Sequence, residues 1–289
     1  MAYRITTDST VDLTPERMQE LGVPFAMLHV LLDGKDLPDD MKESSALYIY
    51  NAMREGHAPT TAQATVESFL EIWEPILKAE EDVLYIAFPS VLSGTINSAL
   101  VAKEQLLERY PSRRIEIVDS ACASSGEGML LELAVRLKNS GLGFDECLRA
   151  VEKLKLRIHH WFTVDDLVYL RRGGRISGAA ATIATLLSIK PILTVTPEGR
   201  LVSHDKIKGR RAAIKKLVQL LEENINIEDT PFVNICHADS RVEAQQLMEL
   251  ITERFPGMDV RIYSVGAVIG AHAGPGTLAV FFVGPERKN

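Results

Sequence analysis

The sequence predicts an α/β protein with two domains, an N-terminal parallel-sheet domain and a C-terminal mixed-sheet domain. The chain has 289 residues, more than one domain usually holds. Short apolar runs alternate with amphipathic helical patterns in the first half, as in parallel βαβ units. The second half adds a candidate hairpin, which brings antiparallel pairing into its sheet. We expect closely packed domains at 1–156 and 157–289, because no linker-like stretch separates them.

The first half opens with a strand at 3–6 and a capped helix. Thr14 is the expected N-cap, Pro15 the first helical residue and Gly22 the stop. The further elements expected are strands at 23–32, 83–88 and 115–118, a helix capped by Ser44 or Ser45 that ends at Gly56, a polar loop at 59–65, a helix that carries Phe69 to Leu77, a helix from about Thr95 to Arg109, and two helical segments that run to about Arg157.

The second half is predicted to combine a mixed sheet with helices. A short helix at 165–172 stops at Gly173-Gly174, and an Ala-rich buried helix follows at 176–187. The expected strands are 161–164, the hairpin partners 189–195 and 200–207, and 232–236, 260–264 and 278–283.

Composition and charge exclude several classes of protein. Apolar residues make up 46% and charged residues 25%, which is typical of a globular chain. The net charge is −7 and no long basic run occurs, so we expect neither nucleic acid nor an anionic membrane surface as a partner. No segment has the length of a membrane span, and no signal-like apolar region follows the N-terminus, so we expect a cytoplasmic protein without stable membrane insertion. Cys122, Cys147 and Cys236 lack metal spacing and are expected to be buried thiols.

Ser93-Gly94-Thr95 is the clearest of several hydroxyl-rich segments that follow predicted strands. In parallel α/β sheets, ligands bind beyond the carboxyl ends of the strands. Gly94 allows close backbone approach, and the helix that starts near Thr95 presents free N–H groups that suit a carboxylate or a phosphate. Thr61 is expected to reach the same rim. The simpler interpretation is that Ser93 and Thr95 only cap the helix.

A glycine-rich segment at 266–276 holds His272 between glycines. This context indicates either a ligand-facing imidazole or a structural hydrogen-bonding one.

Two basic clusters stand at predicted helix ends. Arg171-Arg172-Gly173-Gly174-Arg175 is either a solvated helix end or an electropositive patch for an acidic partner or a phosphate. Arg210 lies in the 206–211 cluster, whose charges either decorate a strand end and helix start or, because positive charge is slightly unfavourable at a helix start, indicate an outside partner.

Common enzyme motifs are absent from the sequence. It contains no P-loop, no dinucleotide fingerprint and no Gly-x-Ser-x-Gly elbow. The adjacent His159 and His160 would point to opposite faces of a strand, so they make a poor metal site, and we expect no metal. A hydrolase or acyltransferase with Ser93 as nucleophile, His272 as base and an aspartate such as Asp8 or Asp119 stays open as an alternative.

In combination, these segments resemble the DegV family, the bacterial fatty-acid-binding proteins that include the acyl-carrying subunit of fatty acid kinase. The resemblance covers the whole chain and rests on motifs that occur together in order. They are Thr7-Asp8-Ser9-Thr10, Pro59-Thr60-Thr61, Ser93-Gly94-Thr95, Val118-Asp119-Ser120, Gly173-Gly174-Arg175-Ile176, Lys190-Pro191-Ile192-Leu193 and the 266–276 segment with His272.

The resemblance implies a non-catalytic carrier, without a cofactor, that buries one long-chain fatty acid between its domains. It implies that Thr61 and Ser93, with Gly94 and Thr95, hold the carboxylate, and that His272 lies close to it. It further implies that the surface near Arg171, Arg172 and Arg210 docks a kinase that phosphorylates the bound carboxylate. The chain has Ala62 where the family often carries Ser, which removes one possible hydroxyl from the site.

Overall fold

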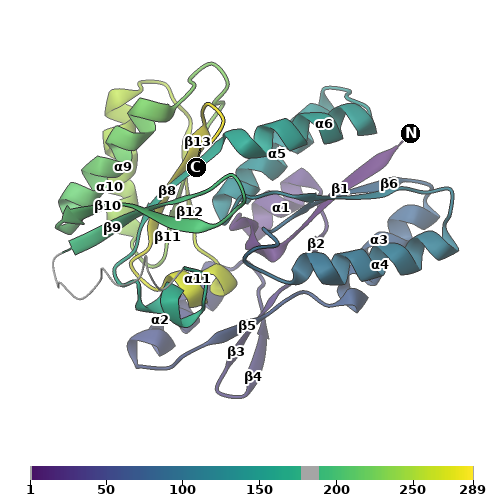
Figure 1. Ribbon diagram of the computed structural model, residues 1–289, viewed down its shortest axis with the longest axis horizontal. Coiled ribbons are helices and arrows are strands. Elements are labelled where there is room, and N and C mark those ends of the chain that lie inside the picture. The colour runs from purple at the N-terminus through teal and green to yellow at the C-terminus, as the bar shows by residue number, and fades with distance from the viewer. Residues whose placement is uncertain (1, 177–188, 289) are drawn as a thin grey trace.

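The protein is described by a computed structural model that covers residues 2–176 and 189–288. Figure 1 shows the N-terminal parallel sheet and its helices to the right and the C-terminal strands and helices to the left, with further N-terminal segments along the bottom. The Ala-rich helix expected at 176–187 lies outside the described residues except for Ile176, which forms a bridge to Leu201.

The N-terminal half contains the predicted parallel sheet, with strand order β2-β1-β6-β7. Every residue of β6 is buried, as expected for a parallel strand covered on both faces. The strands are β1 (Tyr3–Asp8), β2 (Phe25–Ala26), β6 (Asp82–Ala87) and β7 (Ile115–Asp119), and the helices around them are η1 (Ser9–Val11), α1 (Pro15–Leu21), α2 (Glu43–Arg54), α3 (Val66–Lys78), α4 (Thr95–Arg109), α5 (Ser125–Asn139), α6 (Phe144–Leu154) and η2 (Lys155–Arg157).

The helix caps show how local chemistry sets these boundaries. The Thr14 hydroxyl accepts a hydrogen bond from the Arg17 N–H at 3.2 Å, and Gly22 adopts a φ of 63°, which confirms the predicted start and end of α1. The expected cap of α2 at Ser44 or Ser45 is wrong, because the helix begins at Glu43. The Asp40 carboxylate accepts from the Lys42 N–H at 3.1 Å and turns the chain earlier.

A second, antiparallel sheet in this half was not expected. It has the order β4-β3-β5, formed by β3 (His29–Leu32), β4 (Lys35–Pro38) and β5 (Thr60–Ala62). The single strand expected at 23–32 is therefore two strands, and the expected loop at 59–65 contains β5. No residue of β5 is fully buried, so the segment carries no apolar alternation from which a strand could be predicted.

The C-terminal half has the predicted mixed sheet, with the order β10-β9-β8-β13-β11-β12. The expected hairpin is confirmed as the antiparallel pair β9 and β10, while β11 and β12 pair in parallel. The strands are β8 (Ile158–Thr163), β9 (Ile189–Val195), β10 (Leu201–Lys208), β11 (Val233–His237), β12 (Val260–Ser264) and β13 (Leu278–Val283), and the described helices are α7 (Val168–Arg172), α9 (Arg210–Asn224), α10 (Arg241–Arg254) and α11 (Ala267–Ala273).

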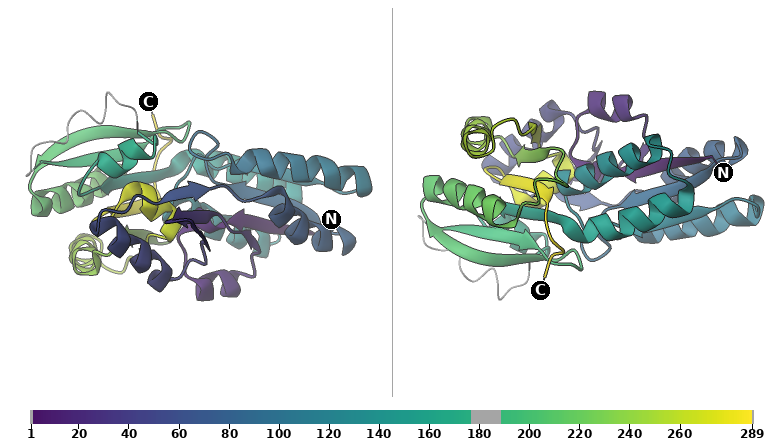
Figure 2. Two further views of the ribbon diagram at one scale, coloured as in Figure 1. Left: turned by 90° about the horizontal axis from the view of Figure 1, so that it is seen from below. Right: turned by 90° about the horizontal axis from the view of Figure 1, so that it is seen from above.

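The two halves share buried structure. Helices α9 and α10 pack with one face of the C-terminal sheet, whereas α5 from the N-terminal half contacts β8, β11 and β13. One cluster of buried apolar side chains accordingly includes residues of both halves, for example Ile86 and Phe281. The views in Figure 2 show the halves packed side by side from below and from above. Because the core is continuous, the boundary at 156 and 157 stays a prediction.

None of the helices in the described ranges is long and apolar enough to cross a membrane. The cytoplasmic location stays a prediction.

Candidate functional site

A largely apolar cavity lies between the two halves. Its empty space, including the part open to solvent, is about 790 Å³. The apolar residues that line it are Leu28, Phe88, Leu92, Ala123, Phe162, Leu170, Val195, Leu201, Val265, Val268, Ile269, Ala273, Ala279 and Phe281. Such a lining suits a hydrocarbon chain, because burial of each CH₂ contributes about 0.8 kcal/mol.

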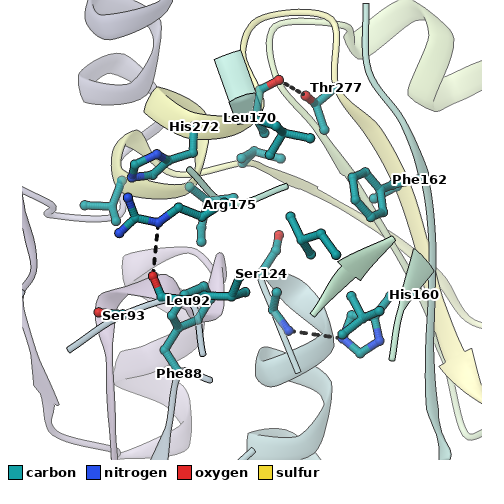
Figure 3. A pocket seen from close by; sticks show the side chains of 18 of the residues that line it. Phe88, Leu92, Ser93, Ser124, His160, Phe162, Leu170, Arg175, His272 and Thr277 are labelled. Atoms are coloured by element: carbon teal, nitrogen blue, oxygen red, sulfur yellow. Dashed lines mark hydrogen bonds between the residues drawn. The ribbon is translucent and has the colours of Figure 1, made fainter. Parts of the chain in front are cut away.

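Several polar side chains lie together on one side of this cavity, whereas Ser124, His160 and Thr277 line other parts of it. Figure 3 shows His272, Arg175 and Ser93 on one side of the pocket, opposite Phe162 and His160. Thr61 also lines the cavity, and its hydroxyl oxygen lies 2.8 Å from His272 Nε2. The cavity therefore has one end able to bind an anion and a remainder suited to an apolar chain.

Thr61 is positioned by the unexpected strand β5. Its backbone pairs with Val30 of β3 in the antiparallel ladder. This pairing directs the hydroxyl to His272, a residue 211 positions later in the chain. The predicted proximity of Thr61 and His272 at one rim is thus present in the structure, although a strand rather than a loop produces it.

The Ser93-Gly94-Thr95 segment divides into one cavity residue and two supporting ones. Ser93 lines the cavity, and its hydroxyl oxygen lies 2.9 Å from that of Thr95 and accepts from the Thr95 N–H at 3.2 Å. Thr95 is completely buried at the start of α4. A Cβ at Gly94 would lie 2.1 Å from Gln63 Oε1, so this glycine accommodates a protein side chain. Ser93 therefore stabilises the helix start and also faces the cavity.

His272 occupies the last turn of α11, and the glycine-rich segment around it is mainly helix. Burial and the charge of Arg175 lower the pKa of His272 to about 4, so its imidazole is neutral at pH 7. A Cβ at Gly173 would lie 2.2 Å from His272 Nδ1, and one at Gly270 would lie 2.4 Å from the Tyr50 hydroxyl. The glycines here allow neighbouring side chains to pack closely against the backbone.

Arg175, expected only as a member of the basic cluster at 171–175 and of a family motif, lines the cavity. Its Nε donates to the Leu92 carbonyl at 3.1 Å, and its Nη1 donates to the Gly173 carbonyl at 2.6 Å. Burial lowers its pKa, and within residues 2–176 and 189–288 no carboxylate forms an ion pair with it. A half-buried guanidinium that contacts carbonyls favours an added anion. The sequence feature that could have indicated this position is the Gly173-Gly174 pair that ends α7. Gly174 has a φ of 70° and turns the chain back toward the cavity.

The three arginines predicted to dock a partner have different surroundings. Arg171 and Arg172 are exposed on α7. Arg210 is bound by Glu243, with Nε and Nη2 at 3.0 and 2.6 Å from the two carboxylate oxygens, and its Nη1 lies 3.7 Å from Asp165. These carboxylates account for a positive charge at the start of α9 without an outside partner.

The geometry does not favour a Ser-His-Asp triad. Among the hydrogen bonds of the described residues, His272 pairs with Thr61 and Ser93 pairs with Thr95. Asp8 is fully buried and accepts from Tyr85 at 2.7 Å. No cluster of three or more His, Cys, Asp or Glu side chains in the described ranges could hold a metal ion.

An apolar cavity with a hydroxyl, imidazole and guanidinium end has the chemistry that suits an amphipathic anion. Comparison with known proteins identifies the family: the family model described as "Uncharacterised protein, DegV family" matches residues 2–284. The chain belongs to the DegV family, which confirms the resemblance seen in its motifs.

Similarity to individual members extends over the whole chain. A DegV domain-containing protein of Clostridium perfringens is 42% identical over 99% of both chains. The solved structure of a fatty-acid-binding DegV family protein from Thermus thermophilus is 30% identical, covers 98% of this chain and 100% of its own, and has a TM-score of 0.87. A DegV described as a fatty acid binding protein from Bacillus subtilis is 27% identical, covers 98% and 99%, and has a TM-score of 0.85. These likenesses confirm the predicted fold class.

Proposed function

We propose that this protein is a carrier that binds one long-chain fatty acid in the cavity between its halves. The observation that carries the proposal is Arg175, a half-buried cation with no carboxylate partner among the described residues, at the polar end of an apolar cavity. The relatives from Thermus thermophilus and Bacillus subtilis, both described as binding fatty acids, support the same ligand class.

The carboxylate would be bound by donors from both halves. Hydroxyls of Ser93 and Thr61 donate to its oxygens, and Arg175 adds a charge-assisted hydrogen bond. Neutral His272 can donate from Nε2 to the Thr61 hydroxyl oxygen, which leaves the Thr61 proton for the carboxylate. Thr95 contributes by donating its N–H to the Ser93 hydroxyl, and Gly94 by leaving room for Gln63 beside that segment. Protein donors can thus replace the hydrogen bonds that the carboxylate makes with water, and burial of the hydrocarbon tail stabilises the complex.

Lipid extraction and mass spectrometry of the purified protein test this function. We expect one free, unmodified fatty acid per chain, and we expect delipidated protein to bind added stearate with a measurable heat. Arg109→Ala, a change at an exposed residue at the far end of α4, is the matched control and should retain the lipid. Absence of lipid and of stearate binding, with turnover of an acyl ester that Ser93→Ala abolishes, would show a hydrolase instead.

We further propose that the carrier presents the bound carboxylate to a separate kinase. The kinase would transfer the γ-phosphoryl group of ATP to a carboxylate oxygen and release ADP and an acyl phosphate. Arg171 and Arg172 support this docking role because both are exposed three or four positions before Arg175. Arg210 is the weaker docking residue, since Glu243 already binds its guanidinium.

Kinase turnover with stearate-loaded protein and a fatty acid kinase catalytic subunit tests the docking surface. Arg171→Ala and Arg172→Ala should keep stearate affinity and raise the carrier concentration needed for half-maximal ADP release. Normal turnover with both variants would remove these arginines from the docking surface.

A further inference from the structure

The N-terminus of α11, the helix that carries His272, is held by two buried carboxylates from the N-terminal half. Asp12 accepts from the Gly266 N–H at 2.9 Å, and Asp39 accepts from the Val268 N–H at 3.3 Å. Both aspartates are about 1% exposed, so these contacts are shielded from water. Helix α11 has no side-chain cap of its own, because its N-cap residue is Gly266.

The glycine at this position allows the carboxylates to approach. A Cβ on Gly266 would lie 2.7 Å from Asp12 Oδ1 and 3.5 Å from both oxygens of Asp39. Asp12 itself has a φ of 47°, in the left-handed region that few non-glycine residues adopt. The chain thus accepts an unfavourable backbone conformation that aims the Asp12 side chain at the helix start.

A third contact ties the same helix to α2. The Tyr50 hydroxyl donates to the Val265 carbonyl at 2.6 Å, and Gly270 packs against its ring. Tyr50 is completely buried. Residues 265–270 are therefore fixed to the N-terminal half by Asp12, Asp39 and Tyr50.

We propose that Asp12 and Asp39 are positioning residues of the carboxylate site, which act by setting where α11 begins and so holding His272 against Thr61. His272 follows Gly266 by six residues, which is about 9 Å along a helix. A shift or rotation of the first turn is passed along so short a helix to its last turn. This inference deepens the proposed function and rests on it for the role of His272.

Asp39→Asn is the informative substitution. One Asp39 oxygen accepts from Val268 and the other accepts from the Met41 N–H at 3.4 Å. An asparagine satisfies only one of these donors, because its NH₂ group then faces the other. The variant keeps the side-chain volume and loosens the helix start.

Glu132→Gln is the matched control. Glu132 is also a buried carboxylate that joins the halves, since it binds Arg17 of α1 and Arg261 of β12. The described contacts of Glu132 do not include α11. Its loss should lower the melting temperature without moving His272.

The primary readout is the ¹⁵N spectrum of the histidine side chains in delipidated protein. The chain has seven histidines, and His272→Gln identifies the relevant signal. We expect Asp39→Asn to shift the His272 signal and Glu132→Gln to leave it in place. This measurement needs no fatty acid, so it remains decisive even if the wild type binds none and the proposed function fails.

The second readout is stearate affinity in a double-mutant cycle. We expect Asp39→Asn to weaken binding about three- to tenfold, and to cause no further loss in the His272→Gln background. If the unfolded fraction of Asp39→Asn prevents measurement, Tyr50→Phe replaces it, because it removes one hydroxyl and keeps the ring. An unmoved His272 signal, or losses that add fully in the double mutant, would overturn the proposal.

Discussion

The two halves of the molecule contribute different chemistry to the cavity. The N-terminal half supplies neutral hydroxyls, Thr61 on β5 and Ser93 before α4. The C-terminal half supplies nitrogen groups, Arg175 after α7 and His272 on α11. The N-terminal hydroxyls already have protein partners, whereas the hydrogen bonds of Arg175 within the described residues go only to carbonyls.

This difference shows that one half of the protein shapes the site and the other half supplies its positive charge. Hydroxyls can both accept and donate, so they stabilise the protein without a ligand and still serve a ligand. A guanidinium can only donate, and its full stabilisation requires an anion. The N-terminal half therefore shapes the carboxylate site, and the C-terminal half makes it selective for negative charge.

Removal of the cation should have the largest effect. Arg175→Ala is expected to weaken stearate binding by about 2–3 kcal/mol, roughly 30- to 150-fold, because a charge-assisted hydrogen bond is lost. Arg175→Lys should recover part of this loss, since it keeps the charge without the forked geometry. Titration calorimetry on delipidated protein checks both, with exposed Arg172→Ala as the control. Equal affinity of Arg175→Ala and wild type would mean that the C-terminal half contributes no charge.

Loss of a hydroxyl that faces the ligand should matter less. Ser93→Ala is expected to weaken binding by about 1.5 kcal/mol, roughly tenfold, with little change in melting temperature. Ser90→Ala is the control from the same loop, because its hydroxyl binds Asp119 at 2.5 Å. The assignment of Ser93 to the carboxylate fails if both variants bind stearate equally well.

Thr61→Val tests the contact that joins the halves. It removes a hydroxyl that pairs with His272, and we expect a loss of about 1 kcal/mol in stearate affinity. Thr60→Val changes the exposed neighbour on β5 and should have no effect. Calorimetry and His272 spectra of both variants check this, and an unshifted His272 signal in Thr61→Val would contradict the contact.

The smallest expected effect is on the pKa of His272. Without ligand its pKa is about 4, because burial and Arg175 disfavour the imidazolium. A bound carboxylate offsets the charge of Arg175, so stearate should raise this pKa. The pKa of His272 in the folded protein lies below the usual 6.5, so the unfolded chain binds the proton at a higher pH than the folded protein does. The free energy of unfolding therefore decreases as the pH falls from 6.5 toward 4.

An NMR titration of His272 with and without stearate measures this shift. His272→Gln should also show a smaller fall in melting temperature over the same pH range than wild type. A ligand-independent pKa would separate His272 from the carboxylate.

Much of the fold follows from short-range patterns. The cap at Thr14, the stop at Gly22 and the apolar run of β6 involve residues within a few positions of one another, and all were confirmed. By contrast, β5 was missed because its pairing with β3 depends on a partner about 30 positions away.

The candidate site divides in the same way. Hydroxyls at Thr61 and Ser93 and the imidazole at His272 were predicted from composition and placement, and all three line the cavity. Which of the clustered arginines faces the cavity was not predictable, because Arg171, Arg172 and Arg175 carry the same charge. Only the backbone turn at Gly174 places Arg175 apart from the other two. The capping of α11 by Asp12 and Asp39 also has no local signal, since those residues precede the helix by more than 200 positions.

Local sequence was therefore sufficient for the α/β class, the order of most strands and helices, and the residue types that suit an anionic head group. Only the tertiary structure decided which cation faces the cavity, how Thr61 meets His272 and what holds α11. The physical reason is the distance along the chain over which each interaction acts. Caps and periodicity act over a few residues, whereas the Thr61–His272 contact spans 211 positions and exists only after both halves pack together.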